Sequence, residues 1–493
     1  MSKIDMYRVG NTLLINSNDG RIVEILKPVL SFTEKKMHQG YAATVRKRQG
    51  LNPMEFVHHT LYRLDQHGRP YTYFGFWKEV TATLKRAGYQ VVCHDNTEVN
   101  KGAVYTPQWS AIEHLNLRAN QPEFIDRLIR SRCGRFDCPP GFGKSFSIGV
   151  IAQLYPQARI DVVSKNVAVL RDRIYKGLLE AGLDVGCVGG GVKDKNHRIM
   201  CYTMASMKHS DHKADILIGD ECHQLAADSA FSQLPNWTES RNFGLSATQD
   251  QRFDGKDTRV HAIFGPVVFS LSYAQAQQDN MVTPIKVKWT EVTKGPKYAS
   301  YENSVASKKN CYWRNTERNR IIANDARQID MNTQSLIVVE TIEHAMNLKK
   351  QLPEYTLVYA ENSLTQADMA EYVRDGYCSA DEPLMDAERK QALTAAFEAG
   401  HLKKVIATSV WNVGVSFNHL AELLRADASV SSINGVQIGG RLSRLEENKS
   451  VSVLRDYIDA YCPDCYRRSR ERSNTYDEQA WSQEFPEKYA GGL

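Results

Sequence analysis

The chain has 493 residues, of which 42% are hydrophobic and 24% are charged, and its formal net charge is +5. This composition excludes wholesale disorder, and the length is enough for about three domains. No run approaches the roughly 18 apolar residues of a membrane span, and residues 1–5 lack a signal-peptide pattern. We therefore expect a cytoplasmic chain without membrane partners, with its ten cysteines as reduced thiols.

The positive charge is concentrated near the N-terminus. Residues 1–104 contain 15 Lys and Arg against 9 Asp and Glu, whereas the remaining residues contain 47 against 48. Such asymmetry is typical of proteins that contact nucleic acid, and a solvated charged surface explains it equally well.

The first hundred residues show the pattern of a small mixed domain. Short apolar runs at Thr12–Ile15 and Ile22–Leu26 flank a turn signal at Asn18–Gly20, which predicts a β-hairpin. A helix is predicted over Trp77–Ala87, and a polar linker follows it. We expect a small α+β domain over residues 1–104.

From Tyr105 onward, short apolar runs alternate with helical stretches, which predicts parallel α/β sheets. The first series gives a lobe over residues 105–282, and the second gives a lobe over residues 283–493 that includes a C-terminal tail. The predicted strands are Arg159–Ser164, Arg198–Thr203, Asp215–Gly219 and Asn242–Ser246 in the first lobe, and Leu336–Val339, Thr356–Tyr359 and Val405–Thr408 in the second.

The segment Cys138–Ser145 has the sequence of a phosphate-binding loop and opens a predicted helix over Ser145–Leu154. Its glycines allow backbone N–H groups to converge on phosphates, while Lys144 would reach the β and γ oxygens and Ser145 would ligate Mg²⁺. Cys138 stands where the general pattern has its first glycine. The nucleotide-binding residues predicted here are Pro140, Gly141, Gly143, Lys144 and Ser145.

Two carboxylates follow a predicted strand 76 residues after Lys144. Asp220 would bind Mg²⁺ through water, and Glu221 would orient and deprotonate an attacking water. By itself such a pair is usually a helix cap or a solvated turn, and the phosphate loop upstream favours the catalytic interpretation. The hydroxyls that end the next strand could bond to this segment and report the state of the nucleotide. The coupling residues predicted are His223, Ser246 and Thr248.

A helix predicted over Ile433–Leu445 carries Gln437, Arg441 and Arg444. Arginines three residues apart share a helix face, so both could approach one anion. A guanidinium in such a place stabilises charge on the γ-phosphoryl group as an arginine finger. The alternative is an exposed basic helix face.

Taken together, these segments resemble the DExH-type superfamily 2 helicases. The phosphate loop, the Asp-Glu-Cys-His segment, Ser-Ala-Thr and Gln-x-x-Gly-Arg-x-x-Arg correspond to that family's motifs I, II, III and VI, over roughly residues 105–445. The resemblance implies two tandem RecA-like parallel-sheet lobes preceded by a small α+β domain. It also implies ATP and Mg²⁺ as cofactors and a nucleic-acid partner, with the oligomeric state open and a monomeric motor compatible with it.

The same resemblance implies roles for further residues. Thr408–Ser416, with Gly414, is similar to motif V, which contacts both nucleic acid and nucleotide, so Thr408 is assigned to nucleic acid and Gly414 to ATP. Gln108 belongs to an upstream Pro-x-Gln element and is expected to read adenine. The first-lobe residues expected to bind nucleic-acid phosphates are Ser164, Lys165 and Thr203.

Residues 264–266, 273–284 and 315–320 resemble the repair and recombination branch, which includes the phage recombination helicase and the eukaryotic excision-repair translocase. That branch acts on duplex, forked or branched DNA, which implies a DNA helicase or translocase, nucleoid-associated or phage-encoded. An RNA helicase and a motor subunit of a restriction-type complex remain open. A DNA-annealing scaffold with an inactive ATPase is disfavoured, because every catalytic residue named above is present.

The two ends of the chain carry weaker signals. Arg46, Lys47 and Arg48 could contact phosphates, and the aromatic residues between Tyr71 and Trp77 could stack on bases, although such clusters are more often core. Cys462 and Cys465 form half of a zinc site, with no second Cys pair in the sequence to complete it, so zinc is left open. The arginines that follow either contact a DNA backbone or lie solvated on a terminal helix, and they are Arg467, Arg468, Arg470 and Arg472.

Overall fold

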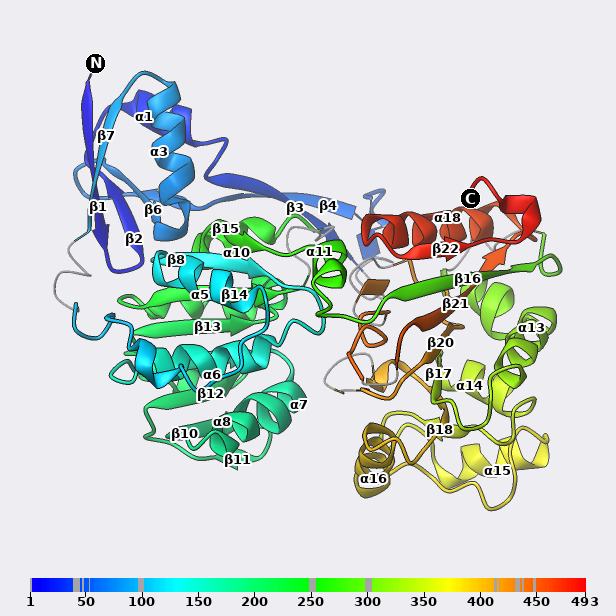
Figure 1. The fold of residues 1–493 in the computed structure, drawn as a ribbon. Coiled ribbons are helices and arrows are strands. Elements are labelled where there is room, and N and C mark those ends of the chain that lie inside the picture. The colour runs from blue at the N-terminus through cyan, green and yellow to red at the C-terminus, as the bar shows by residue number, and fades with distance from the viewer. Residues whose placement is uncertain are drawn as a thin grey trace. The chain divides into compact units, whose positions relative to one another are not determined.

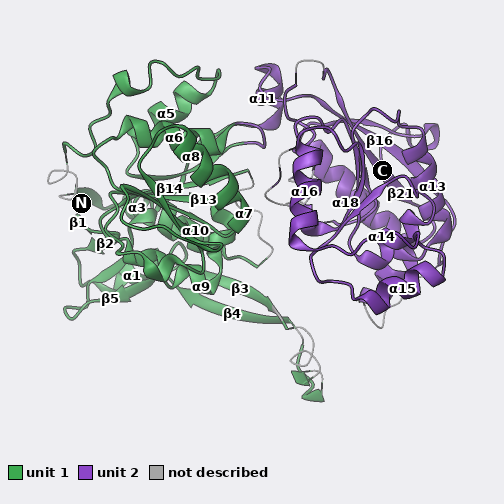
Figure 2. Ribbon diagram, turned by 90° about the horizontal axis from the view of Figure 1, so that it is seen from below, with its two compact units in different colours: residues 1–138, 143–271 green, residues 139–142, 272–493 purple. Residues whose placement is uncertain are grey.

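The computed structural model forms two compact units, coloured separately in Figure 2. Unit 1 consists of residues 1–138 and 143–271, and unit 2 of residues 139–142 and 272–493. In the described part of the chain, no helix is both long and apolar enough to cross a membrane. The division at residues 104 and 282 stays a prediction. The described residues are 2–38, 45, 46, 48–52, 54–95, 102–247, 254–297, 304–411, 415, 417–430, 435, 436, 439–446 and 449–493.

The N-terminal part of unit 1 is a small α+β domain (Figure 1). Its five-stranded sheet has the order β5-β6-β2-β1-β7, and apolar side chains of α1 and α3 pack on the sheet in one cluster. The elements are β1 Lys3–Val9, β2 Thr12–Ile15, α1 Gly20–Leu26, β5 Tyr62–Leu64, β6 Pro70–Tyr73, a 3₁₀ turn Phe74–Phe76, α3 Trp77–Arg86 and β7 Gln90–Asp95.

The hairpin predicted from Thr12–Ile15 and Ile22–Leu26 is wrong. Strand β2 pairs instead with β1 in an antiparallel register, and the second run lies in α1. The cause is Asp19, whose side chain accepts the N–H of Arg21 at 3.0 Å and caps the helix. The helix predicted over Trp77–Ala87 is confirmed as α3.

The larger part of unit 1 is an eight-stranded sheet with the order β11-β10-β12-β9-β13-β14-β8-β15. Every pairing is parallel except that of β10 with β11. The four strands predicted for the first lobe are confirmed as β9, β12, β13 and β14. The strands are β8 Cys133–Asp137, β9 Ile160–Ser164, β10 Val185–Gly189, β11 Val192–Lys193, β12 Ile199–Thr203, β13 Ile216–Asp220, β14 Arg241–Ser246 and β15 Val267–Ser270. The helices are α5 Gln121–Ile129, α6 Lys144–Leu154, α7 Val167–Val169, α8 Lys176–Glu180, α9 Asp228–Phe231 and α10 Asp257–Phe264, with short 3₁₀ or π turns at Trp109–Ala111, Leu170–Tyr175, Met207–His209, Cys222–Ala226 and Leu234–Asn236.

The N-terminal domain packs tightly on α10. A Cβ added at Gly75 would lie 2.2 Å from the carbonyl oxygen of His261, so the two backbones are in direct contact there. The ring of Phe76 stacks on His261, with the ring centroids 5.0 Å apart. Phe74 and Phe76 are buried, so these two members of the aromatic cluster belong to the core. The domain is therefore an integral part of unit 1.

A two-stranded ribbon leaves this domain and projects away from the rest of unit 1 (Figure 2). Strands β3 Ser31–Met37 and β4 Met54–Thr60 pair antiparallel along their whole length. Near its base, the carboxylate of Glu34 contacts Lys256 and His59 at 2.9 Å each. His59 is part of the ribbon, so the contact with Lys256 is the one that anchors the ribbon to the rest of unit 1.

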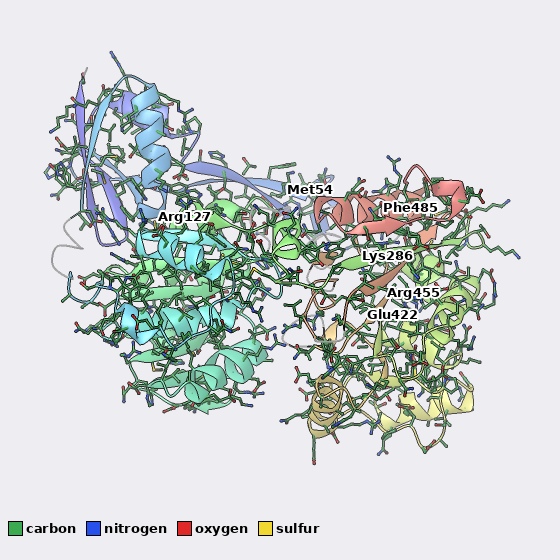
Figure 3. All side chains as sticks on the ribbon, viewed as in Figure 1. Met54, Arg127, Lys286, Glu422, Arg455 and Phe485 are labelled. Atoms are coloured by element: carbon green, nitrogen blue, oxygen red, sulfur yellow. The ribbon has the colours of Figure 1, made fainter. Side chains whose placement is uncertain are left out.

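Unit 2 contains a seven-stranded sheet with the order β18-β19-β17-β20-β21-β16-β22, and all its pairings are parallel. Glu422 and Arg455 lie on adjacent strands (Figure 3) and form an ion pair at 2.7 Å. The three strands predicted for the second lobe are confirmed as β17, β18 and β19. The strands are β16 Ile285–Val292, β17 Ser335–Val338, β18 Thr356–Val358, β19 Lys404–Ala407, β20 Glu422–Arg425, β21 Ser452–Asp459 and β22 Ser482–Glu484. The helices are α11 Tyr273–Gln278, α12 Ser304–Lys308, α13 Thr316–Arg327, α14 Ile342–Lys349, α15 Gln366–Arg374, α16 Ala387–Glu398 and α18 Pro463–Glu478, with turns at Lys309–Trp313, Ser409–Trp411 and Glu487–Tyr489.

Buried charge fixes α18 against the sheet of unit 2. Arg472 is 1% exposed, and its Nε lies 3.0 Å from Asp456 Oδ2, while its Nη2 donates to the carbonyl of Tyr457 at 2.8 Å. Neither predicted alternative, DNA contact or solvation, describes Arg472. By contrast, Arg467 has a side chain that is 58% exposed and pairs with Glu471 on the same helix.

We expect Arg472→Leu to lower the free energy of unfolding of the full chain by about 3–5 kcal/mol, because it leaves the carboxylate of Asp456 buried without its cation. The matched control, Arg467→Leu on the solvent face of α18, should change it by less than about 1 kcal/mol. Urea denaturation followed by circular dichroism measures both. Equal effects of the two substitutions would contradict a structural role for the buried pair.

Candidate nucleotide-binding site

Several of the site residues predicted for unit 1 lie along one edge of its larger sheet. Strands β12, β9, β13, β14 and β8 are neighbours and run parallel, so their carboxyl ends meet there. In open α/β sheets this is the edge at which ligands bind. The residues at or just after these ends are Thr203, Ser164, Lys165, Asp220, Glu221, Ser246 and the phosphate loop.

The phosphate loop connects β8 to α6. Gly141 and Gly143 have φ angles of 90° and 94°, in the left-handed region that favours glycine. Cys138 is buried, and its N–H donates to the carbonyl of Ser246 at 2.8 Å. Because this residue continues the strand pairing, it does not need the conformational freedom of glycine. Helix α6 begins at Lys144, and a helix N-terminus directs N–H groups toward an anion.

Lys144 lies between the loop and the acidic segment. Its Nζ is 3.4 Å from Glu221 Oε1 and donates to the carbonyl of Cys138 at 3.3 Å. Burial acts to lower the pKa of Lys144, but Glu221, Cys138 and Asp220 outweigh it and raise that pKa above its usual value. Lys144 is therefore a cation at neutral pH, as a phosphate ligand must be.

Asp220 ends β13 as a buried carboxylate, 3% exposed. Burial, together with the charge of Glu221, raises its pKa to about 7. The hydroxyl of Ser164 donates to Asp220 Oδ2 at 3.2 Å, so this buried side chain supports the carboxylate, and its contact with nucleic acid stays a prediction. A nearby divalent cation stabilises a desolvated carboxylate. The side-chain oxygens of Asp220 and Ser145 are of the kind that Mg²⁺ prefers. The residues present thus fit Mg²⁺ brought in with a nucleotide.

Glu221 has a strained backbone, and His223 connects its segment to β14. Glu221 lies in the left-handed region at φ 46° and ψ 53°, a sparsely populated conformation for non-glycine residues that recurs at functional sites. His223 is 4% exposed. Its Nδ1 lies 2.7 Å from the hydroxyl of Ser246 and 3.5 Å from Glu221 Oε2. The hydrogen bond expected between Ser246 and the acidic segment is therefore present.

A glutamine that the sequence analysis missed lies beside the phosphate loop. A Cβ added at Gly143 would be 3.1 Å from Nε2 of Gln121, which begins α5 and is buried. Gln108 is exposed, and its N–H donates to the carbonyl of Leu154, at the opposite end of α6 from the loop. The signal that could have identified Gln121 is its position at the start of the apolar helix α5, which leads into β8.

Several other predicted residues keep their status as predictions. Lys165 is exposed, whereas Thr203 and Thr408 are 6% and 8% exposed. In the N-terminal domain, Arg46 donates to the carbonyl of Asn52 at 3.0 Å. Four predicted residues lie outside the described residues, and they are Lys47, Thr248, Gly414 and Gln437.

Among the described residues, the helix predicted over Ile433–Leu445 is confirmed at residues 435, 436 and 439, which are helical, and wrong beyond them. Residues 440–443 form turns, and residues 444–446 are not helical. Glycine has low helix propensity, and a serine side chain that bonds to the backbone competes with the helix. Both factors act here, because Gly439 and Gly440 are consecutive and the hydroxyl of Ser443 donates to the carbonyl of Gly440 at 2.6 Å.

The two arginines of this segment therefore do not form an exposed helix face. Arg441 is 7% exposed, and its Nη1 donates to the carbonyl of Val415 at 3.1 Å. Its guanidinium lies 5.4 Å from the ring centroid of Phe417. Arg444 is partly buried, and its carbonyl accepts the hydroxyl of Thr283 at 2.9 Å. The local structure holds both backbones in place within unit 2.

No protein-family model matches the chain. Among curated proteins, it is 24% identical over 275 residues to a protein of Sulfolobus islandicus filamentous virus that is provisionally named helicase 22, covering 52% of this chain and 46% of the relative. It is 23% identical over 398 residues to a protein of Haloarcula marismortui provisionally named DNA 3'-5' helicase Rad25, covering 76% of this chain and 57% of the relative. The chain thus spans about half the length of these relatives. Their names support an ATP-dependent helicase enzyme.

Solved structures show the same fold. A fragment of an HsdR subunit of a type I restriction enzyme from Vibrio vulnificus matches with a TM-score of 0.56 at 14% identity, covering 98% of this chain and 92% of that one. Dbp5 of Saccharomyces cerevisiae, bound to RNA and ADP BeF3, matches with a TM-score of 0.51 at 11% identity, covering 78% and 93%. At these identities the likeness shows the fold alone, which is that of two tandem RecA-like lobes and confirms the predicted fold class.

Proposed function

We propose that the chain is an ATP-dependent DNA helicase or translocase of superfamily 2, related to the repair and recombination branch. The observation that carries this proposal is the clustering of Lys144, Asp220 and Glu221 at the ligand-binding edge of the unit 1 sheet. A cation, a buried carboxylate and a strained acidic residue in this arrangement are the groups that hydrolysis of a nucleoside triphosphate requires. The helicase names of the relatives support the same reading.

Each group has a distinct part in the proposed hydrolysis. Lys144 and the N–H groups that begin α6 bind the phosphates of ATP, and the oxygens of Ser145 and Asp220 hold Mg²⁺. The ion, when bound, neutralises charge that develops on the phosphoryl oxygens. Glu221 accepts a proton from the attacking water, because a carboxylate at its position adjoins the phosphate loop.

Two further assignments concern the nucleotide. We assign contact with the base to Gln121 in preference to Gln108, because Gln121 adjoins the phosphate loop. Arg441 and Arg444 act as arginine fingers on the γ-phosphate. Gln437 keeps its predicted catalytic role, and Gly414 keeps the contact with ATP that the family resemblance implies. His223 and Ser246 transmit the state of Glu221 to β14 through their hydrogen bond.

We expect Glu221→Gln to reduce ATP turnover by about 10²–10⁴-fold while ATP still binds, because the amide keeps the shape of the side chain but cannot accept the proton. Arg441→Ala and Arg444→Ala should each slow turnover by about 10³-fold with little effect on DNA binding in the absence of nucleotide. Lys144→Ala is the contrasting variant, since it should weaken ATP binding itself. Single-turnover hydrolysis and nucleotide-binding titrations separate these effects. Near-normal turnover by Glu221→Gln would remove the residue from its assigned role.

DNA is the proposed substrate, and RNA is the main alternative. The support for DNA is the resemblance to the repair and recombination branch and the name of the archaeal relative. A translocase that moves along any sequence contacts phosphates rather than bases. The short hydroxyl-bearing and basic side chains at the strand ends are compatible with such phosphate contacts. Action as a restriction-type motor subunit would require a nuclease partner.

The activation of ATP hydrolysis by nucleic acids tests this choice. We expect forked or branched DNA to raise the steady-state ATPase rate at least tenfold over the rate without nucleic acid, and to raise it more than single-stranded RNA of equal length does. The comparison should include single-stranded DNA, duplex, fork, four-way junction and RNA at one salt concentration, since salt changes all of these affinities. Activation by RNA alone would favour the RNA helicase.

The ribbon β3–β4 is the proposed DNA grip of the N-terminal domain. On its outer face Lys35 is paired across the strands with Phe56, and Phe56 is 62% exposed. Arg46 and Arg48 follow toward the tip, and Arg48 is exposed. Basic and aromatic side chains side by side on an exposed ribbon suit phosphate contact and stacking. Residues 31–60 contain 5 Lys and Arg against 2 Asp and Glu, which is half of the net positive charge of residues 1–104.

Neutralising Arg46, Lys47 and Arg48 together to Ala should weaken DNA binding to the same degree for unrelated sequences. The slope of log affinity against log salt should become shallower by up to about 2.7, or about 0.9 for each lost phosphate contact. The matched control replaces Lys78, Lys85 and Arg86, three exposed cations of α3 in the same domain, and should leave the slope unchanged. Fluorescence anisotropy across a salt series measures both. If the two triple variants behave alike, the ribbon is not a grip. We choose substitution because deletion of residues 1–104 would expose the surface of α10 on which the N-terminal domain packs.

A further inference from the structure

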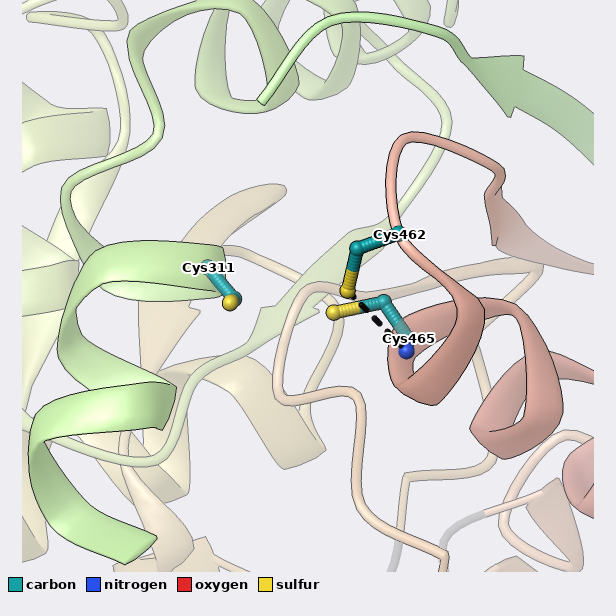
Figure 4. A group of neighbouring side chains, drawn as sticks. All are labelled: Cys311, Cys462 and Cys465. Carbon is teal, nitrogen blue, oxygen red and sulfur yellow. Dashed lines mark hydrogen bonds between the residues drawn. The ribbon is translucent and has the colours of Figure 1, made fainter. Parts of the chain in front are cut away.

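Three cysteines from distant parts of the sequence converge in unit 2 (Figure 4). The sulfur atoms of Cys311, Cys462 and Cys465 all lie within 4.8 Å of one another. Their residues are 0%, 3% and 2% exposed, respectively. Within the described residues, no other group of three or more potential metal ligands lies so close together. Cys311 is therefore an additional potential metal ligand beside the pair Cys462 and Cys465.

The fold positions the three thiols from two separate segments. Cys311 lies in the turn Lys309–Trp313 that leads toward α13, and Cys462 and Cys465 lie at the start of α18. Cys462 is the N-cap of α18, and its sulfur accepts the N–H of Cys465 at 3.4 Å. The hydroxyl of Tyr461 donates to the carbonyl of Cys311 at 2.7 Å, which joins the two segments next to the sulfurs.

We propose that Cys311, Cys462 and Cys465 bind a zinc ion that fastens the start of α18 to the segment preceding α13. Zinc takes tetrahedral sets of thiolates at about 2.3 Å, which places neighbouring sulfurs about 3.8 Å apart. The separation of the three sulfurs is within reach of this value by small side-chain rotations.

The chemistry of the site favours a soft cation over a hard one. Thiolates select ions such as Zn²⁺ and exclude Mg²⁺ and Ca²⁺, which require oxygen ligands. The hydrogen bond from the N–H of Cys465 to the sulfur of Cys462 is of the kind that orients a metal ligand.

The three thiols provide three of the four ligands that zinc takes. The fourth position is assigned to water or a small exogenous ligand. A site of this composition responds to added imidazole, whereas a site closed by four protein ligands does not. The neighbouring Asp459 ends β21 and pairs with Arg318 of α13 at 2.8 Å, so a zinc ion here would reinforce a junction next to this ion pair.

Metal content and cobalt spectroscopy of the full chain test the proposal. Protein purified without chelators should contain one zinc per chain by mass spectrometry of the digested sample. After removal of zinc, Co²⁺ should produce the d–d absorption of a tetrahedral ion together with sulfur-to-cobalt charge transfer, and imidazole should shift the d–d bands. Failure of both Zn²⁺ and Co²⁺ to bind the reduced wild-type chain would overturn the proposal.

Single substitutions identify the ligands. Cys311→Ser, Cys462→Ser and Cys465→Ser should each lose the bound zinc and the cobalt charge-transfer band, and Cys311→His should retain zinc because imidazole is also a ligand. The control is Cys378→Ser, a partly buried cysteine elsewhere in unit 2, which should retain one zinc per chain. Retention of zinc by all three serine variants would show that the ion binds elsewhere.

A disulfide between Cys462 and Cys465 is the competing use of the same residues. Alkylation of the unfolded chain without reductant, followed by mass spectrometry, distinguishes the two outcomes. All ten cysteines should be alkylated if the thiols bind zinc. A chain that lacks zinc and carries two unalkylated cysteines linked to each other would overturn the metal site.

Discussion

The carboxylate of Asp220 is buried in unit 1, and the groups around it offset part of the electrostatic free energy that burying this charge costs. Water cannot solvate this group, and the negative charge of Glu221 next to it adds to the penalty. Ser164 donates one hydrogen bond to it, and Lys144 brings a positive charge nearby. A divalent cation would offset much more of the cost, because its field acts at short range where little water screens it. The electrostatics of this carboxylate are thus compatible with the Mg²⁺ nucleotide proposed for the site.

The local parts of this site could be predicted from the sequence. The strand that ends at Asp220 was predicted correctly, because it depends on a short run of apolar residues. The roles assigned to the phosphate loop, Asp220 and Glu221 stay predictions. The helix over Ile433–Leu445 failed where two glycines and a serine outweigh apolar periodicity. The hairpin at Asn18–Gly20 failed because an aspartate side chain can cap a helix as well as occupy a turn. In both cases two local patterns of hydrogen bonds compete, and the tertiary structure determines which of them forms.

Contacts between distant segments could not be read from the sequence. Gln121 and Gln108 both precede the phosphate loop in the sequence. Only the structure shows that Gln121 lies near the start of α6, beside the loop, and that Gln108 lies near its other end. Cys311 precedes Cys462 by 151 residues, and no spacing rule connects them. Arg472 has the sequence context of a solvated basic helix, yet it is buried, because Asp456 on β21 provides a partner of opposite charge. In each case the decisive information is which element packs beside which.

The placement of β16 has a consequence for the order in which the protein folds during synthesis. This strand pairs with β21 over Ser452–Asp459 and with β22 over Ser482–Glu484, although it comes early in unit 2. A ribosome must therefore extend the chain by almost 200 residues before β16 gains both of its neighbours. Until then the strand presents unpaired backbone groups and apolar side chains, the features that invite association with other chains. The eight-stranded sheet of unit 1 is complete once β15 ends at Ser270, so the first unit can fold while the second is still being made.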